Sequence, residues 1–346
     1  MYSKIIRPIL FLIPPEVVHH IIVWALKCID LIPGAHFLLR KIFNVSNPAL
    51  STTVLGLHFN NPVGLAAGFD KNADFFRQLE VFGFSFIEIG TVTPKPQIGN
   101  PKPRLFRLPK DKALINRMGF NNKGVIYASR LIQRSKKRII IGGNIGKNTD
   151  TPNNLAVNDY MSCFKEIYDS VDYIVVNISC PNIKDLRELQ EGGELKDILV
   201  PLIKDRAHKK LYKPILIKIS PDISIEQLYE TLKAAEEVGI DGYVATNTTT
   251  SRDKLASPVE KVSKIGNGGL SGLPLKQRST EIIRLIHQYT NGKKPIIGVG
   301  GIMTPEDALD KLNAGASLIQ IYTGFIYSGP LLIKRINQAI IKNHFN

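Results

Sequence analysis

The chain has 346 residues, with 45 Lys and Arg against 30 Asp and Glu, so its formal net charge is +15. A content of 44% hydrophobic and 22% charged residues is that of a globular protein and excludes a disordered chain. The three cysteines lack a CxxC spacing and the seven histidines lack ligand spacing, which excludes a disulfide framework and a zinc ribbon and leaves a metal site unsupported.

Residues 1–45 are apolar, basic and interrupted by Pro14-Pro15 and Pro33-Gly34, which predicts a hairpin of short helices with Pro15 at a first helical position. The longest uninterrupted apolar run, residues 21–26, is far shorter than the roughly 20 residues that span a bilayer. No small-residue cleavage site follows residues 9–13, so a signal peptide is not expected. An interfacial membrane anchor and a helical cap packed on the main domain both fit, and one hairpin could serve as both.

Eight short apolar runs follow, separated by helical patterns such as residues 224–238 and 304–314, where Ser224 and Thr304 suit N-caps. Such runs are expected of parallel strands covered by helices. They are residues 63–67, 84–90, 139–145, 173–178, 215–219, 242–246, 296–299 and 318–322. We predict a (β/α)8 TIM barrel over residues 46–346, with the N-terminal helices as an extension. A doubly wound sheet is the alternative, but no GxGxxG follows the first strand.

Polar residues and glycines finish each predicted strand at its carboxyl end, where barrel enzymes build their active sites. This ring has no His and few acids, so a metal hydrolase and a glycosidase are excluded. Glycines after the seventh strand and Thr323 after the eighth match a phosphate site, and residues 268–272 read as a further flexible turn. We expect a flavin, because Lys218 could stabilise negative charge on its reduced ring. A structural ion pair is the alternative for Lys218, but the ring offers no nearby acid.

Seven segments of the chain resemble motifs of the dihydroorotate dehydrogenases. They are AAGFDK at 66–71, IGTVTP at 89–94, NRMGFNN at 116–122, NIGKN at 144–148, VNISCPN at 176–182, ATNTT at 245–249 and IGVGG at 297–301. Residues 1–45 look like the extension of the quinone-linked, membrane-associated class. The resemblance implies an FMN enzyme that oxidises (S)-dihydroorotate to orotate in pyrimidine (UMP) synthesis and passes electrons to a membrane quinone. Such a protein would lie peripherally at the inner face of the cytoplasmic membrane, in contact with lipid.

Carried over motif by motif, the resemblance implies three sets of site residues. FMN would be held by Ala67, Gly68, Phe69, Asp70, Lys71, Thr91, Asn144, Asn177, Lys218, Thr246, Ser271, Gly272, Gly301, Tyr322 and Thr323. Dihydroorotate would be held by Lys71, Asn116, Arg117, Met118, Gly119, Phe120, Asn177, Asn182, Asn247 and Thr248. The residues that resemble those facing the quinone are His19, Arg107 and Tyr322. A lysine can pair with the orotate carboxylate, and side-chain amides suit a cyclic imide. An ordinary surface histidine is the alternative for His19.

Cys180 stands where the quinone-linked class usually has a serine as the base that removes the C5 proton, and cysteine is more typical of the soluble class. Residues 183–185 also depart from the usual Thr-Pro-Gly, although Asn182 and Leu186-Arg187 match. A thiol, with a reference pKa of about 8.5, ionises more readily than an alcohol. We predict that Cys180 is the catalytic base; a buried structural cysteine is the alternative.

Three rival functions remain open from the sequence. A soluble dihydroorotate dehydrogenase that uses fumarate or NAD would fit Cys180 but not residues 1–43. An FMN-dependent tRNA dihydrouridine synthase would fit the basic charge but needs a C-terminal RNA-binding domain. A non-catalytic phosphate-binding barrel leaves Lys71 and the asparagines unexplained. The basic clusters at 134–138 and 204–213 do not interleave aromatic residues as a base-stacking surface would, so we expect no nucleic-acid partner.

Overall fold

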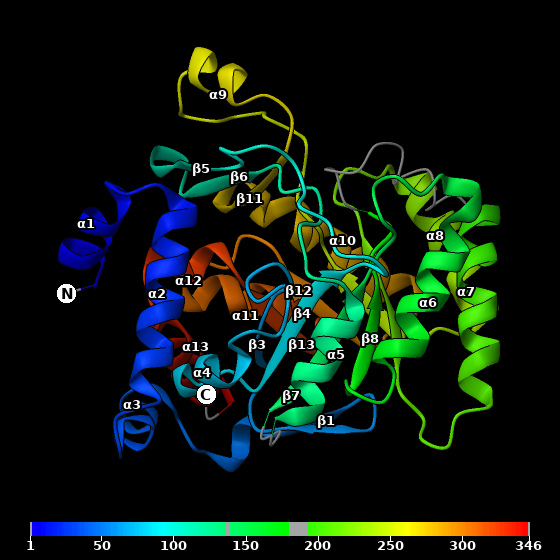
Figure 1. Cartoon of the computed structure of the whole chain (residues 1–346), viewed down its shortest axis with the longest axis horizontal. Coiled ribbons are helices and arrows are strands. Elements are labelled where there is room, and N and C mark those ends of the chain that lie inside the picture. The colour runs from blue at the N-terminus through cyan, green and yellow to red at the C-terminus, as the bar shows by residue number, and fades with distance from the viewer. Residues whose placement is uncertain (1, 136–138, 180–191, 345–346) are drawn as a thin grey trace.

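Eight parallel strands close into a barrel at the centre of the computed structural model, which describes residues 2–135, 139–179 and 192–344 (Figure 1). Around the barrel the strands follow the order β10-β12-β13-β3-β4-β7-β8-β9. Their bounds are β3 (Val63–Leu65), β4 (Phe86–Val92), β7 (Ile140–Ile145), β8 (Tyr173–Val176), β9 (Ile215–Ile219), β10 (Gly242–Ala245), β12 (Ile296–Val299) and β13 (Leu318–Ile321). Each overlaps a predicted run, and β4 extends two residues beyond its run, so the predicted TIM barrel is confirmed.

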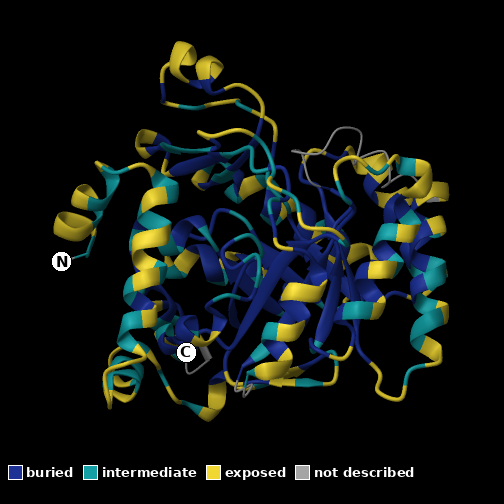
Figure 2. Ribbon diagram, viewed as in Figure 1, coloured by how far each residue is buried: buried dark blue, intermediate teal, exposed yellow. Residues whose placement is uncertain are grey.

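Helices cover the outside of the barrel, and the strands beneath them are buried (Figure 2). The main helices are α5 (Val125–Arg134), α6 (Ala156–Ile167), α7 (Gly192–Ala207), α8 (Ile225–Val238), α10 (Lys276–Tyr289), α11 (Pro305–Asn313) and α13 (Leu331–His344). Shorter ones are α4 (Phe76–Leu79), α9 (Val259–Ile265), α12 (Thr323–Ser328), η2 (Pro48–Leu50), η3 (Glu80–Phe82), η4 (Pro109–Asp111), η5 (Asn153–Leu155) and η7 (Leu273–Leu275). The predicted N-caps are confirmed, since Ser224 and Thr304 each form a capping box with the residue three positions on.

The N-terminal residues form a π-helical turn η1 (Tyr2–Ile6) and helices α1 (Arg7–Phe11), α2 (Pro15–Ile29) and α3 (Ala35–Phe43) on one flank of the barrel (Figure 1). Pro15 is the first residue of α2, as predicted. No single described helix is long and apolar enough to cross a membrane. The stretches Tyr2–Phe11 and Pro15–Ile29 reach that length only together, and they are bent by 118° where they meet.

Two small sheets accompany the barrel and were not predicted. The first is the antiparallel hairpin of β1 (Thr52–Val54) and β2 (Leu57–Phe59). The second has the order β11-β6-β5 and joins β5 (Leu105–Leu108), β6 (Ala113–Asn116) and β11 (Gly269–Gly272). The prediction of a flexible turn at 268–272 was therefore wrong, because the backbone of these glycines pairs with β6 (Asn116 opposite Gly269).

Candidate active site

A pocket opens at the carboxyl ends of the barrel strands, and the three-stranded sheet contributes to its wall. The predicted site residues that line it are Ala67, Gly68, Lys71, Thr91, Asn116, Met118, Phe120, Asn177, Lys218, Thr246, Asn247, Thr248, Ser271, Gly272, Gly301, Tyr322 and Thr323. The structure therefore brings together residues that are spread over more than 250 positions of the chain.

Five described residues that were predicted to hold FMN or dihydroorotate do not line the pocket. Asn144 lies beneath it, and Phe69 packs edge-to-face against the ring of Tyr322, with ring centroids 5.5 Å apart. Asp70 accepts hydrogen bonds from the backbone N–H groups of residues 74 and 75 at 2.8 and 2.9 Å, so its carboxylate shapes the loop after β3. Burial raises the pKa of Asp70 to about 6, although these two hydrogen bonds oppose the shift.

The remaining two of these five, Arg117 and Gly119, support the substrate-side loop. Arg117 donates to the carbonyl oxygens of Ile265 and Pro103, both at 3.0 Å, and its guanidinium therefore holds loops together. Gly119 has a φ of +67°, and a Cβ at this position would lie 2.8 Å from the side chain of Asn100. Glycine is thus required by the backbone here. The predicted base and Asn182 lie outside the described residues.

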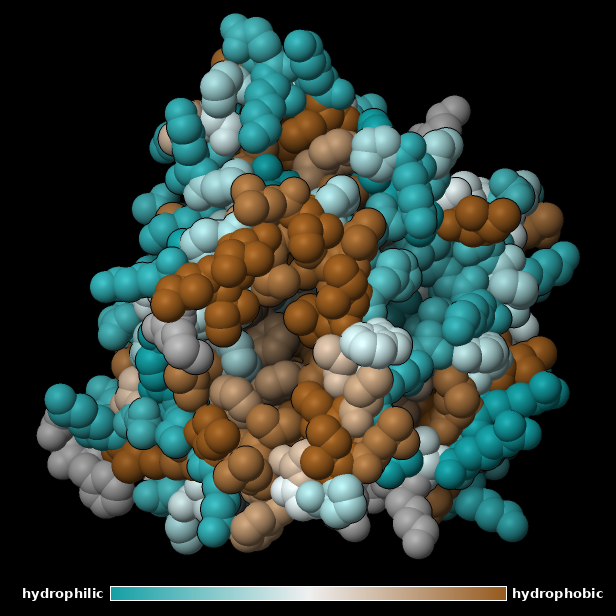
Figure 3. Space-filling model, turned by 60° about the vertical axis from the view of Figure 1, so that its left-hand side comes forward, coloured by the Kyte–Doolittle hydropathy of each residue, from teal (hydrophilic) through white to brown (hydrophobic). Residues whose placement is uncertain are grey.

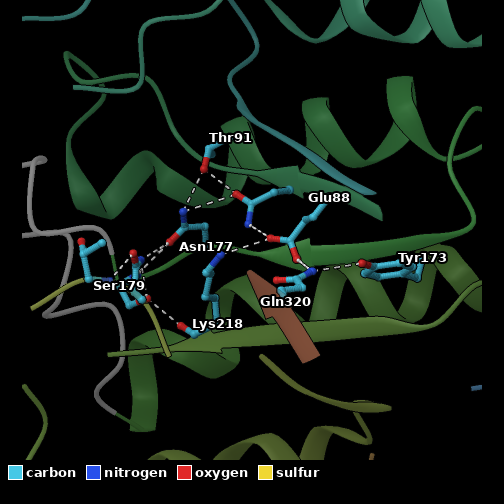
Figure 4. A network of polar contacts seen from close by, with 10 residues as sticks. Glu88, Thr91, Tyr173, Asn177, Ser179, Lys218 and Gln320 are labelled. Carbon is cyan, nitrogen blue, oxygen red and sulfur yellow. Dashed lines mark hydrogen bonds and ion pairs between the residues drawn. The ribbon is translucent and has the colours of Figure 1, made fainter. Parts of the chain in front are cut away.

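A layer of side-chain amides is held in fixed orientations at the pocket floor (Figure 4). Thr91 donates through Oγ1 to Oδ1 of Asn144 at 2.5 Å and accepts from Nδ2 of Asn177 at 2.8 Å. Oδ1 of Asn177 in turn accepts from Nδ2 of Asn247 at 3.1 Å, and Nδ2 of Asn247 also donates to Oγ of Ser179 at 3.0 Å. Because each amide has its donors and acceptors assigned by a neighbour, the layer presents a defined pattern to a planar ligand.

Lys218 forms a buried ion pair that was not predicted from the sequence. Its Nζ donates to Oε1 of Glu88 at 3.2 Å, and the Glu88 side chain is fully buried (Figure 4). The statement that no acid lies near Lys218 was wrong. Glu88 lies in the middle of β4, among residues that are otherwise uncharged and, apart from Gly90 and Thr91, apolar. A charge inside such a strand is itself unusual and could have been noticed. Its partner could not, because that pairing depends on how the barrel closes.

The opposite end of the pocket is built from bare backbone and hydroxyl groups. Gly300 and Gly301 have φ values of +120° and +73°, and both line the pocket after β12. Ser271 and Thr323 also line the pocket, and their hydroxyl oxygens are hydrogen-bonded at 2.8 Å. Consecutive backbone N–H groups in such conformations and nearby hydroxyls are the donors that a phosphate group requires. This end therefore fits the phosphate of a cofactor.

Gln320 supplies a further sign that a ligand belongs in the pocket. Its Nε2 donates to Oε2 of Glu88 at 2.7 Å, whereas its buried Oε1 has no hydrogen-bond partner among the described residues. Gln320 also lines the pocket. A buried acceptor without a donor is rare in folded proteins, and a ligand with an N–H group would satisfy it. The amide layer, Lys218 and the phosphate end together fit a flavin mononucleotide.

The residues predicted to face a quinone lie where the N-terminal helices approach the pocket. His19 of α2 packs against the rings of Phe69 and Phe75, both with centroids 5.5 Å away. Burial, with help from the neighbouring charges of His20 and Lys71, lowers the pKa of His19 to about 4, so its ring is neutral at pH 7. This placement contradicts the alternative of an ordinary surface histidine.

Arg107 and Tyr322 continue this side of the pocket. Arg107 of β5 donates to the carbonyl oxygen of Ile13 at 2.6 Å and lies 4.5 Å from the centre of the Phe11 ring. The guanidinium therefore fixes the junction between α1 and α2 to the sheet that walls the pocket. Tyr322 lines the pocket and contacts the ring of Phe69, and burial raises the pKa of its hydroxyl to about 12.

The outer face of the N-terminal helices is apolar. Large exposed side chains here include Ile9, Leu12, Trp24 and Leu31, and the last is 81% exposed. Turned forward in Figure 3, this side of the molecule shows hydrophobic residues gathered around a central hollow. Contiguous apolar surface of this kind on a folded protein marks a site of interaction with a membrane or another apolar partner.

The chain is similar to known proteins along its whole length. It matches the family described as dihydroorotate dehydrogenase over residues 49–343. It is 54% identical to the dihydroorotate dehydrogenase (quinone) of Christiangramia forsetii, covering 99% of both chains. It is 47% identical to that of Chromobacterium violaceum, covering 98% of this chain and 97% of the relative. The crystal structure of DHODH from Eimeria tenella in complex with ferulenol superposes with a TM-score of 0.85 at 37% identity, covering 95% of this chain and 91% of that chain. The chain therefore belongs to the dihydroorotate dehydrogenase family.

Proposed function

We propose that the protein oxidises (S)-dihydroorotate to orotate in pyrimidine biosynthesis, with FMN as its cofactor and a membrane quinone as the final electron acceptor. The observation that carries this proposal is one pocket that joins Lys71 and the amide layer to a phosphate-binding end. The relatives named dihydroorotate dehydrogenase (quinone) span the N-terminal helices as well as the barrel, which supports the choice of acceptor.

The pocket residues divide between the two parts of the cofactor. Gly300, Gly301, Ser271 and Thr323 would hold the phosphate, and Lys218 and the amide layer would lie along the ring. When bound, the flavin supplies a two-electron acceptor next to the substrate. The protein's own contribution is to orient both molecules and to place a positive charge where the reduced ring carries negative charge.

The substrate would bind on the side of the pocket that carries Lys71 and Asn116. Lys71 can pair with the orotate carboxylate, and it donates to Oδ1 of Asn121 in this structure. The amides of Asn177 and Asn247 offer donors and acceptors to the cyclic imide. Cys180 would take the C5 proton on its thiolate. That role stays a sequence-based proposal, as does the contribution of Asn182.

The N-terminal helices would place the quinone-facing residues at a lipid surface. Their apolar outer face and basic flanking residues suit a peripheral contact with the inner leaflet of the cytoplasmic membrane. Co-sedimentation with anionic vesicles tests this contact. Leu31→Glu should weaken it, whereas Leu211→Glu should not, because Leu211 is comparably exposed, at 69%, but lies after α7. Equal binding of the two variants would contradict the proposed orientation.

A spectroscopic experiment tests the reaction. The purified protein should show a flavin spectrum that dihydroorotate bleaches and a short-chain quinone restores. Restoration by fumarate or NAD but not by quinone would favour the soluble class. Retention of tRNA without bleaching would favour a tRNA dihydrouridine synthase, and a flavin that dihydroorotate cannot bleach would overturn the proposed activity.

A further inference from the structure

Glu88 lies beneath the pocket floor, where its carboxylate accepts hydrogen bonds from three other side chains (Figure 4). Its Oε1 accepts from Nζ of Lys218 at 3.2 Å and from Nδ2 of Asn144 at 2.7 Å, and its Oε2 accepts from Nε2 of Gln320 at 2.7 Å. These partners come from β9, β7 and β13, while Glu88 itself lies on β4. One buried carboxylate thus fixes groups from three other strands.

We propose that Glu88 is a positioning residue that sets the reduction potential of the bound flavin, by compensating the charge of Lys218 and by orienting the amide of Gln320. The inference rests on the proposed function, because it assumes that a flavin occupies the pocket above this layer. Glu88 is not among the residues that line the pocket, so it would act through its partners.

Glu88 first changes the net charge beside the pocket. Lys218 lines the pocket and is 5% exposed, and Glu88 is fully buried, so water screens neither charge well. Together they form a neutral pair. Reduction of a flavin adds negative charge, which an uncompensated lysine stabilises more strongly than a paired one. Glu88 therefore keeps the potential lower than Lys218 alone would make it.

Glu88 also fixes the orientation of the Gln320 side chain. A glutamine side chain can present either its carbonyl or its NH₂ group to a ligand. Here the NH₂ group of Gln320 donates a hydrogen bond to the carboxylate of Glu88. The same nitrogen also makes a longer contact, of 3.5 Å, with the hydroxyl of Tyr173. The carbonyl oxygen is left as a buried acceptor without a described partner. The imide N–H of a flavin ring could donate to this carbonyl oxygen. Glu88 therefore also determines that Gln320 presents its carbonyl group, and not its NH₂ group, to the ring.

The test compares midpoint potentials of flavin-loaded proteins. Glu88→Gln keeps the shape of the side chain but removes its charge, and we expect it to favour the reduced flavin at least tenfold. For a two-electron couple this is a positive shift of about 30 mV. Tyr173→Phe is the matched control, since it removes a neutral contact in the same buried layer and should leave the potential at the wild-type value. Flavin affinity, measured by fluorescence, should fall in Glu88→Gln because Gln320 loses its fixed orientation.

A double variant covers the case in which Glu88→Gln alone leaves a buried lysine unpaired and fails to fold. Glu88→Gln combined with Lys218→Met removes both buried charges and leaves no unpaired ion. If Glu88 compensates the charge of Lys218, this exchange of a neutral pair for neutral side chains should leave the potential near the wild-type value, whereas loss of an uncompensated lysine charge should lower it. A folded Glu88→Gln protein with an unchanged potential, or a double variant whose potential falls, overturns the inference while leaving the proposed activity intact. A wild-type protein that binds no flavin overturns the proposed function, and this inference with it.

Discussion

Substitution of Gly301 by alanine should damage the phosphate end of the pocket by a calculable amount. Gly301 has a φ of +73°, and a Cβ at this position would lie 2.3 Å from Cα of Lys276 and 2.5 Å from its backbone nitrogen. The left-handed conformation costs an L-residue about 1–2 kcal/mol. Overpacking against a neighbour that cannot simply rotate away costs about 1–3 kcal/mol more. Gly301→Ala should therefore lower the free energy of unfolding by about 2–5 kcal/mol.

Gly239→Ala separates these two contributions. Gly239 ends α8 with a φ of +82°, and no described atom outside its immediate neighbours would lie within 4 Å of an added Cβ. This control variant should lose only the conformational part, about 1–2 kcal/mol. Urea unfolding followed by far-UV circular dichroism measures both variants, and absorbance after gel filtration reports how much flavin each retains. Gly301→Ala should also lose flavin, since its backbone must move. Equal stability and equal flavin content in the two variants would refute the reasoning.

Three further predictions concern single side chains. If Cys180 is the base, Cys180→Ala should lose about 10²–10⁴-fold in turnover. Cys180→Ser should need a higher pH than wild type for its activity. An alanine variant with full turnover would exclude this role. Lys71→Ala should reduce kcat/KM for dihydroorotate about 10- to 150-fold, which corresponds to the loss of one charged hydrogen bond. Removal of the exposed Lys123 side chain should leave kcat/KM unchanged. Equal effects of the two substitutions would count against a contact between Lys71 and the substrate carboxylate. Burial lowers the pKa of Lys311 from 10.5 to about 7. Between these two pH values the unfolded chain therefore binds more protons than the folded protein. The free energy of unfolding should rise with pH across this window, by up to about 1.36 kcal/mol per pH unit. Lys311→Met should lose that slope in denaturant titrations at several pH values, and a variant that keeps it would contradict the assigned cause.

The barrel could be predicted from the sequence because its strands are buried on both sides. Parallel strands in this setting are apolar along their whole length, and caps such as Ser224 and Thr304 mark the helices between them. The sheet of β5, β6 and β11 could not be predicted in this way. Its strands are short, and β11 is rich in glycine, so its local pattern is that of a turn. Only pairing with β6, about 150 positions away, makes it a strand.

The same distinction holds for the site, where motifs could be predicted from the sequence and contacts between distant elements could not. Motifs predicted which residues gather at the pocket, because strand ends in a barrel all meet on one face. They did not predict that Asp70 would turn toward its own loop or that Arg117 would hold Pro103 and Ile265. Nor did they reveal Glu88, whose three contacts depend on the register of four strands. Side-chain direction inside a loop and pairing across a barrel are tertiary properties.

The seam between β3 and β13 has a consequence for the order of folding. Gly64 lies opposite Gln320 there, so the first and last strands of the barrel must meet before the sheet is continuous. Contacts between such distant positions form slowly, because a long stretch of chain has to be ordered first. Ala67 and Lys71 follow one side of this seam, and Tyr322 and Thr323 follow the other. A growing or partly folded chain therefore has no complete cofactor site, and uptake of flavin would report that the last strand has closed the barrel.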